Sequence, residues 1–221
     1  DQEWLAFSAE GSGTPSVCYA EFAQTRLIEF SLTLLQGQIA LEYGEAGEHP
    51  CILRFGLASW DLFRDALSLI LSRGVHYAPA EILAHPLPPE CDRLSFGMRS
   101  TLQESLMPND NLCELCSWTR LDVATTMDRL LLHPGGLVLT KNYLCLVTAD
   151  DPSDRSGASD LSGYNRGVIF MSRDFPIVGR TISHDGIDEI QLTVGRESQE
   201  SFVNLFVPRA STATVFKMLS Q

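Results

Sequence analysis

Hydrophobic side chains in residues 50–74 change from a strand-like run to the spacing of a helix. The run "PCILRFG" at 50–56 is short and β-rich. The next apolar positions recur every three or four residues and line one helical face: Trp60, Phe63, Leu67, Ile70 and Leu71. Ser59 suits the N-cap, and Gly74 suits the left-handed position after the last turn. The pattern predicts a strand followed by an amphipathic helix.

The same order returns near the C-terminal end, where "FVNLFVPRASTATVFKMLSQ" occupies residues 202–221. A β-rich run leads there to small polar residues and then to a second helical stretch. Further β-rich runs precede the first helix, at 3–7, 16–24, 26–35 and 38–43. The run at 26–35 also fits a helical stripe, which leaves its type open. Each half of the chain is therefore predicted to form several short strands and then one amphipathic helix.

A proline-marked segment separates these halves. Four prolines fall within residues 77–92, and proline removes a backbone donor and restrains the residue before it. Downstream, Ser95 or Ser100 suits the cap of a helix that stops before Pro108. Asn109 or Asp110 suits the cap of a second short helix. Residues 77–118 are therefore predicted to be a linker with short helices.

The chain becomes β-rich again after Arg120. "LVLT" and "YLCLV" flank Lys141 and Asn142 as the strands of a hairpin would. Residues 150–167 are rich in Ser, Asp and Gly and predict a long exposed loop of disordered type. The sequence thus predicts an α+β fold, mainly β, with two small antiparallel modules at 1–76 and 119–221. Each module ends in a helix, and the linker joins them.

The segment "GGLVLTKNYLCLV" at 135–147 resembles the core hairpin of GRAM domains and other members of the pleckstrin-homology (PH) superfamily. The run "FPIVGRTISHDGIDEIQL" at 175–192 resembles that family's next strands, and 201–219 resembles its last strand and C-terminal helix. The resemblance covers residues 119–221, whereas 1–76 share only the order of strands and helix. It implies a bent antiparallel barrel of seven strands closed by a helix, or a tandem of two. It also implies a non-catalytic role in binding phosphoinositides or proteins.

The net charge of the chain restricts the classes of partner that it can bind. The formal net charge is −12, which favours repulsion of nucleic acids and so argues against a nucleic-acid partner. Only residues 119–221 come close to balance, with 12 acidic and 10 basic side chains. A phosphoinositide headgroup needs several converging bases. The candidates near predicted strand ends, besides Arg120, are Arg129, Lys141, Arg173 and Arg180.

The six cysteines do not define a strong site. "CELC" places Cys113 and Cys116 at a spacing found in zinc and redox sites, where two thiolates one helical turn apart meet one metal or each other. A structural zinc needs two more ligands at similar spacing, and none follow. The chain is large enough to fold without disulfides, which favours a reducing, cytosolic setting. Zinc or redox chemistry at "CELC" remains a distant alternative.

No motif indicates catalysis. The sequence lacks the G-x-S-x-G, H-E-x-x-H and phosphate-loop patterns, and it offers no cofactor signature. The sequence therefore predicts a non-enzymatic scaffold or adaptor fragment that binds proteins through PH-like modules, without a cofactor. We expect it in the cytoplasm, peripheral on membranes, in trafficking or signalling. The first alternative is a phosphoinositide-binding module that targets membranes.

Overall fold

The computed structural model describes residues 4–9, 16–33, 35–44, 51–119, 121–124, 129–132, 134–149, 165–196 and 199–221. The fold is α+β and mainly β, as the sequence predicts. Among the described residues no helix is long and apolar enough to cross a membrane. Most of the predicted loop, residues 150–164, lies outside the described residues, and the next three residues begin strand β11.

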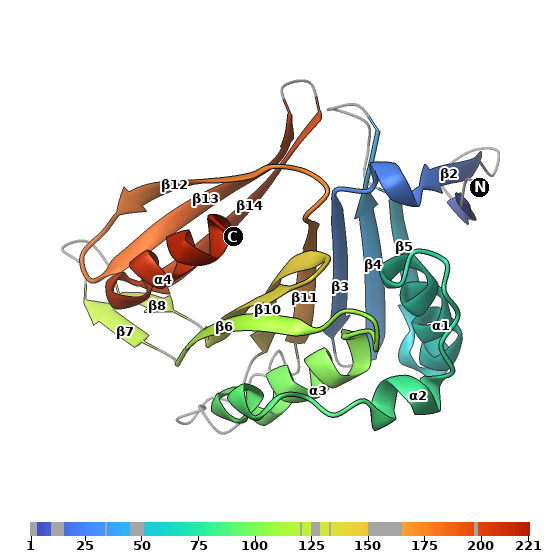
Figure 1. Cartoon of the computed structure of the whole chain (residues 1–221), viewed down its shortest axis with the longest axis horizontal. Helices are drawn as coiled ribbons and strands as arrows, with labels where there is room; N and C mark the ends of the chain where they lie inside the picture. The colour runs from blue at the N-terminus through green and yellow to red at the C-terminus, as the bar shows by residue number, and fades with distance from the viewer. Residues whose placement is uncertain are drawn as a thin grey trace.

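Seven of the described strands form one antiparallel sheet, called the large sheet, in the order β5-β4-β3-β11-β10-β9-β6 (Figure 1). Their bounds are β3 Leu27–Thr33, β4 Gln36–Glu42, β5 Cys51–Gly56, β6 Leu112–Trp118, β9 Gly135–Thr140, β10 Tyr143–Ala149 and β11 Asn165–Ser172. The open run at 26–35 is thus a strand. The predicted hairpin is confirmed, because β9 and β10 pair on either side of Lys141 and Asn142.

The large sheet crosses the predicted boundary between modules, so the expectation of a separate sheet in each half does not hold. Strand β3 of the N-terminal half pairs with β11 of the C-terminal half, where Phe30 lies opposite Val168. Both strands turn apolar side chains to the same face, and these share one core that includes Phe30, Val168 and Phe170. Pairing joins the two apolar faces and removes two unpaired strand edges, which favours one sheet over two.

Helices cover that face of the large sheet. Their bounds are α1 Trp60–Leu71, α2 Pro79–Ala84 and α3 Phe96–Ser105, with 3₁₀ turns η1 Phe22–Gln24, η2 Leu57–Ser59 and η3 Pro89–Arg93. The stripe predicted for α1 is confirmed by burial of Leu67, Ile70 and Leu71. The left-handed position directly after the C-cap Ser72 is taken by Arg73, with φ 57°, and not by Gly74 as predicted. Gly74 follows with φ 89°, and its amide donates to the Leu69 carbonyl at 2.7 Å.

The two predicted serine caps differ in outcome. Ser95 caps α3, since its side chain accepts a hydrogen bond from the Met98 amide at 3.4 Å. Ser59 occupies the N-cap position of α1, but its side chain makes no capping hydrogen bond. The first turn of α1 instead follows directly from η2.

The second helix predicted after Asn109 is wrong, because residues 112–118 form the edge strand β6. Its side chains alternate between the two faces of the large sheet. Cys116 and Trp118 enter the core on one face, while Leu112 and Leu115 pack against the helical core on the other. Successive side chains of a strand point to opposite faces of the sheet, so an extended segment can contribute to both cores, whereas a helix at the sheet edge cannot.

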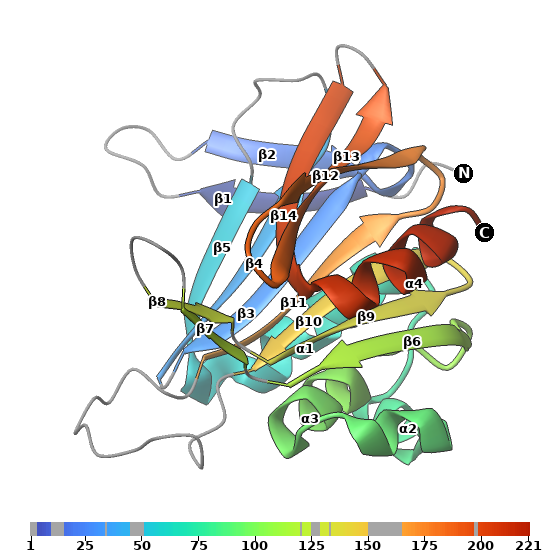
Figure 2. The ribbon, with the colours of Figure 1, turned by 90° about the vertical axis from the view of Figure 1, so that its left-hand side faces the viewer.

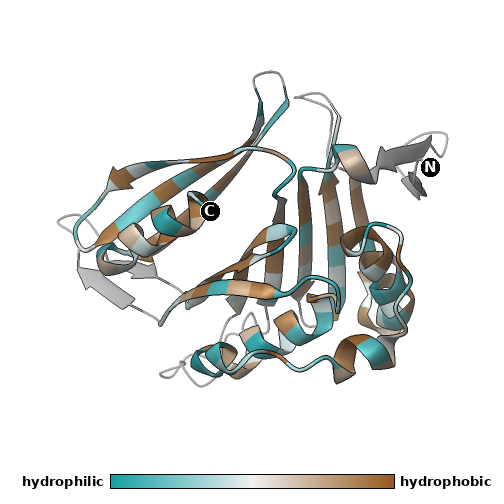
Figure 3. Ribbon diagram, in the orientation of Figure 1, coloured by the Kyte–Doolittle hydropathy of each residue, from teal (hydrophilic) through white to brown (hydrophobic). Residues whose placement is uncertain are grey.

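The opposite face carries a second layer, called the small sheet, which consists of β12 Ile177–Ser183, β13 Ile187–Arg196 and β14 Gln199–Pro208. In Figure 2 this sheet and the helices α2 and α3 lie on opposite sides of β6, β9 and β10. The hydropathy colours of Figure 3 alternate along its strands, as expected for a sheet with one buried face. Buried side chains on that face include Ile190, Leu192, Val203 and Leu205.

Helix α4, Arg209–Leu219, closes the small sheet as the sequence predicts. Buried Asp188 holds it, because this carboxylate accepts a hydrogen bond from the Thr212 hydroxyl at 2.7 Å and another from Arg209. Two separate hairpins complete the described strands, β1 Trp4–Ala9 with β2 Ser16–Glu21 and β7 Leu121–Ala124 with β8 Arg129–Leu132.

A buried arginine joins the two sheets. Arg26, just before β3, donates from Nε to the Ser201 hydroxyl of β14 at 3.1 Å and from a terminal nitrogen to the Gly44 carbonyl at 2.5 Å. Its own amide bonds to the Glu42 carbonyl at 2.9 Å. The N-terminal half is thus bonded to the small sheet as well as to β11.

Truncation of Phe30 to alanine tests the shared core. The side chain is fully buried and stacks on Trp60 with ring centroids 4.8 Å apart, so Phe30→Ala should lower the free energy of unfolding by about 3–5 kcal/mol. Because the halves share one sheet, calorimetry should show a single transition that moves as a whole. Leu35→Ala, at a side chain 72% exposed, should change stability by less than about 0.5 kcal/mol. Two separate transitions, of which only one moves, would contradict the shared core.

Candidate functional site

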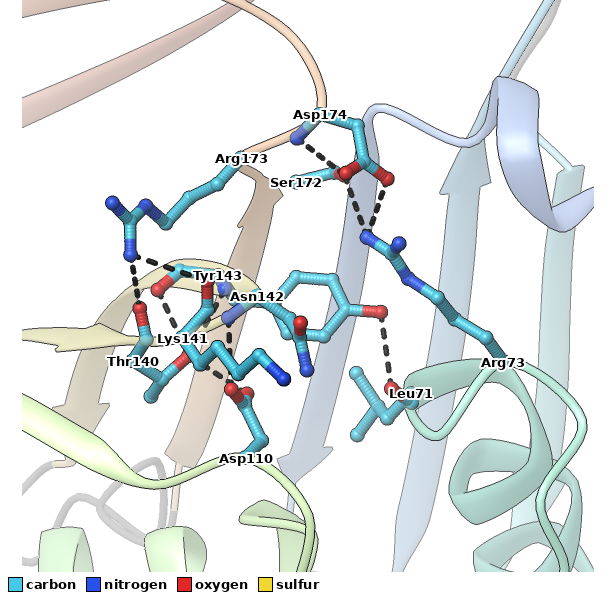
Figure 4. Close-up of polar contacts among 10 residues, drawn as sticks. All are labelled: Leu71, Arg73, Asp110, Thr140, Lys141, Asn142, Tyr143, Ser172, Arg173 and Asp174. Atoms are coloured by element: carbon cyan, nitrogen blue, oxygen red, sulfur yellow. Dashed lines mark hydrogen bonds and ion pairs between the residues drawn. The ribbon is translucent and has the colours of Figure 1, made fainter.

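The turn between β9 and β10 carries the candidate site that the sequence pointed to, called the hairpin corner (Figure 4). Lys141 is exposed at the turn, and its amide donates to the Asn111 carbonyl at 3.2 Å. The Thr140 hydroxyl closes the turn by accepting the Tyr143 amide proton at 2.9 Å. The turn is therefore held in one conformation by its own side chains and by the segment before β6.

Asp110 fixes the hairpin corner from below. This buried carboxylate accepts the Thr140 hydroxyl proton at 2.7 Å and the Asn142 amide proton at 2.8 Å. Burial raises the pKa of Asp110 above its ordinary value, while these two hydrogen bonds and the nearby charge of Arg73 offset part of that rise. The sequence suggested Asp110 as a helix cap, whereas the structure makes it the anchor of a hairpin.

Two arginines border the hairpin corner, and each makes hydrogen bonds or an ion pair with residues there. Arg173 donates from a terminal nitrogen to the Thr140 carbonyl at 2.7 Å and to the Lys141 carbonyl at 3.2 Å. Arg73, at the end of α1, forms an ion pair with Asp174 at 2.5 Å. Both cations therefore contribute to holding the corner together.

Tyr143 links the corner to helix α1. Its hydroxyl donates to the Leu71 carbonyl at 3.1 Å, and its ring lies against the Arg73 guanidinium, 5.9 Å from the ring centroid. Burial raises the pKa of Tyr143 to about 12, so the phenol stays a neutral donor at physiological pH.

Of the four bases that the sequence proposed for lipid binding, the structure places two at the hairpin corner. They are Lys141 and Arg173, and the Arg173 guanidinium donates to the main-chain carbonyl of Lys141. Arg180 is exposed on β12 of the small sheet, opposite Gln191. Arg129 is the first residue of β8, and its side chain lies outside the described residues. Convergence of all four bases on one headgroup is therefore not supported by the described part of the chain.

The cysteines of "CELC" lie on a strand. Cys113 is exposed beside the irregular step between Leu112 and Glu114, and Cys116 is buried in the core. Burial raises the pKa of the Cys116 thiol, which disfavours the thiolate that metal binding or redox exchange needs. The helical spacing on which the zinc or redox alternative depended is therefore wrong. The described residues contain no group of three or more His, Cys, Asp or Glu that could hold a metal ion.

Comparison of the chain with protein-family models, with curated protein sequences and with solved structures gave no match. The resemblance to GRAM and PH-like domains therefore stays a prediction.

An open groove in the helical layer was not foreseen from the sequence. It has a volume of about 440 Å³ between α2, η3 and α3, and its apolar lining includes Leu83, Leu87 and Phe96. Phe96 is 79% exposed and Leu83 is 48% exposed. We call it the helical groove. The only sequence signal was that Phe96 follows the Ser95 cap directly and so begins the helix away from its buried face.

A second hollow, called the inter-sheet cleft, lies between the two sheets. Its volume is about 180 Å³, and its wall on the large sheet includes Leu27, Glu29, Ala40 and Glu42. Strand β14 supplies the opposite wall through Phe202, Val203 and Asn204. Strands β3 and β4 are neighbours in the sequence, but β14 lies far from them along the chain, so no local pattern could have grouped the two walls.

Replacing Asp110 with asparagine tests the buried carboxylate. The folded pKa is raised above the value of 3.8 for a free side chain, so folding favours the protonated acid. That stabilisation is fully present below the unfolded pKa and is lost as pH rises through the folded pKa. The unfolding free energy of the wild type, relative to Asp110→Asn, should therefore fall as pH rises across this window. Urea titrations at a series of pH values measure the difference, and a constant difference would contradict the assignment.

Proposed function

We propose that this chain is a non-catalytic scaffold that binds other proteins, in the cytoplasm and close to membranes, in trafficking or signalling. The helical groove is the observation that carries the proposal. Single exposed apolar residues are ordinary, but apolar side chains gathered in one hollow are typical of interaction sites. In the helical groove the exposed apolar side chains are Phe96 and Leu83. Arg99 and Asp92 add charged groups to the same lining.

The helical groove is held in shape before any partner arrives. Gln103 on α3 donates from its amide nitrogen to the carbonyls of Ile82 at 3.1 Å and His85 at 2.7 Å, which ties α2 to α3. Glu104 pairs with Arg166 of β11 through two hydrogen bonds of 3.1 Å, which ties α3 to the large sheet. A preformed surface loses little conformational entropy on binding, which supports a role in recognition.

Substitution of the two exposed apolar side chains tests this function. The double variant Phe96→Ser, Leu83→Ser should keep a melting temperature close to that of the wild type, because neither side chain is buried. The partner is first captured from cell extract with the wild type, then purified and shown to bind the wild type directly. The double variant should lose this direct binding. A loss of about tenfold or more in affinity is expected if Phe96 is a central anchor.

Leu62→Ser is the matched control, since Leu62 is 70% exposed on α1 and does not line the helical groove. This control should bind the purified partner as the wild type does. Equal binding by all three proteins would rule out the helical groove as the recognition surface.

Phosphoinositide binding is the second candidate function, and the position of Lys141 and Arg173 on the same hairpin corner favours it. The Lys141 side chain is exposed at a rigid turn, which suits contact with a phosphate group. Two features oppose it. Asp174 neutralises Arg73, and the whole chain carries a net charge of −12.

Flotation with liposomes that carry single phosphoinositides distinguishes this candidate. If the hairpin corner binds a headgroup, Lys141→Ala should reduce the floated fraction several-fold, because one phosphate contact and its released counterion are lost. Arg180→Ala removes an equal charge from the small sheet and serves as the control. Equal losses in both variants would indicate a diffuse charge effect rather than a site, and no flotation of the wild type would remove lipid binding from consideration.

A further inference from the structure

Strand β14 is the outer strand of the small sheet, and among the described strands it pairs only with β13. The Arg209 amide donates to the Gly186 carbonyl at 3.2 Å, just beyond the last pair of this ladder. The Gly195 amide donates to the Pro176 carbonyl at 3.0 Å, so the odd-numbered residues of β13 bond to the β12 side and the even-numbered ones to β14. Because bonded and non-bonded pairs alternate in antiparallel ladders, alternate residues of β14 direct their N–H and C=O groups away from β13. These residues are Phe202, Asn204 and Phe206.

The free edge of β14 opens on the inter-sheet cleft. Side chains of Phe202 and Asn204 leave one face of the strand and Val203 leaves the other, yet all three line the cleft. A hollow that touches both faces lies at the edge of the strand. Phe202 is 68% exposed there. The unpaired backbone groups of β14 are therefore accessible from the cleft.

Two glutamate side chains line the cleft on the large sheet. Glu29 and Glu42 stand on adjacent strands of the large sheet, where Glu29 is paired with Ala40 and Glu42 with Leu27. Both are half-buried. Within the described part of the chain, neither carboxylate has a hydrogen bond or ion pair. An incoming cation is attracted to carboxylates of this kind at close range.

We infer that the free edge of β14 takes an extended basic segment of a partner protein as a fourth strand of the small sheet. Main-chain hydrogen bonds to Phe202 and Asn204 hold the segment, and its lysine or arginine side chains reach Glu29 and Glu42. Residues of the opposite parity in the segment cover the exposed ring of Phe202. This inference rests on the proposed protein-binding function and adds a second surface with a stated partner chemistry.

Charge decides between the occupants of such an edge. An acidic or phosphorylated segment would face two like charges within a chain of net charge −12. A second copy of this chain would bring residues 201–207 of its own β14, which contain no charged side chain. It would leave both carboxylates without a counter-ion. A basic extended segment satisfies the strand edge and the carboxylates together, as strand addition does when side chains alternate between two faces.

The probe is a short labelled peptide in which valine and lysine alternate, with a peptide of valine and glutamate for comparison. The wild-type chain should bind the lysine peptide and not the glutamate peptide. Glu29→Gln with Glu42→Gln should weaken binding about tenfold or more, because both charge pairs are lost. Glu90→Gln with Asp185→Asn makes an equal change of charge at exposed positions outside the cleft and should leave affinity within about twofold.

A second pair of variants tests strand addition itself. Asn204→Pro removes the edge amide without breaking a bond to β13, and proline is tolerated on edge strands. It should abolish peptide binding at an unchanged melting temperature. Asn204→Thr keeps the amide and should bind the peptide. Hydrogen exchange should show protection of the amides of Phe202, Asn204 and Phe206 when the lysine peptide is present.

Equal binding of both peptides, or full binding by Asn204→Pro, overturns the inference. Failure of the lysine peptide to bind the wild type also overturns it. The proposed function is judged separately, by whether Phe96→Ser with Leu83→Ser loses a purified protein partner. A chain that keeps that partner but ignores the lysine peptide retains the function without this second surface.

Discussion

The pairing of β3 with β11 is the contact on which the rest of the structure depends. It joins strands that lie more than a hundred residues apart in the chain, from Leu27 against Met171 to Thr33 against Asn165. Each hydrogen bond of the ladder contributes only about 0.5–1.5 kcal/mol net. The larger effect is that Phe30 and Phe170 enter one core, so α1, α2 and α3 cover a face to which both halves contribute. Neither half needs a closed barrel of its own.

The inter-sheet cleft follows from the same pairing. The small sheet and α4 cover the second face of the large sheet over β9, β10 and the near side of β11, where Leu137, Leu144 and Met171 are buried. Because β3, β4 and β5 extend the large sheet, part of that face lies outside the area that the small sheet and α4 cover. Glu29 and Glu42 lie on this extension, beside the free edge of β14. A closed barrel would have no such boundary.

Local structure could be predicted from the sequence because local patterns specify it. The helical stripe of α1, the cap Ser95 and the turn at Lys141 each depend on residues a few positions apart. The prediction failed at residues 112–118, where the candidate caps Asn109 and Asp110 indicated a short helix and the chain instead forms the edge strand β6. It also failed to group Glu29 with Phe202, since only the long-range pairing of strands brings them together.

The predicted lipid site shows the same division. Lys141 and Arg173 lie at the same corner because the hairpin and β11 are neighbours, and that hairpin was visible in the sequence. Arg180 lies apart because β12 turns away into the small sheet. Asp110 was noted only as a cap, although it anchors the corner through Thr140. Charge spacing along a chain does not determine convergence in space.

The outer strands of this fold are protected unequally. At β6, Glu114 pairs with Lys217 of α4 at 2.8 Å, and the ladder is irregular beside Cys113. At β5, Arg54 places a charge on the edge. Charges and bulges of this kind keep sheet edges from pairing with other chains. Strand β14 has neither between residues 201 and 207, and two of its phenylalanines are exposed. An apolar edge left without these safeguards is a liability to a free protein, and it becomes an advantage once a partner strand covers it.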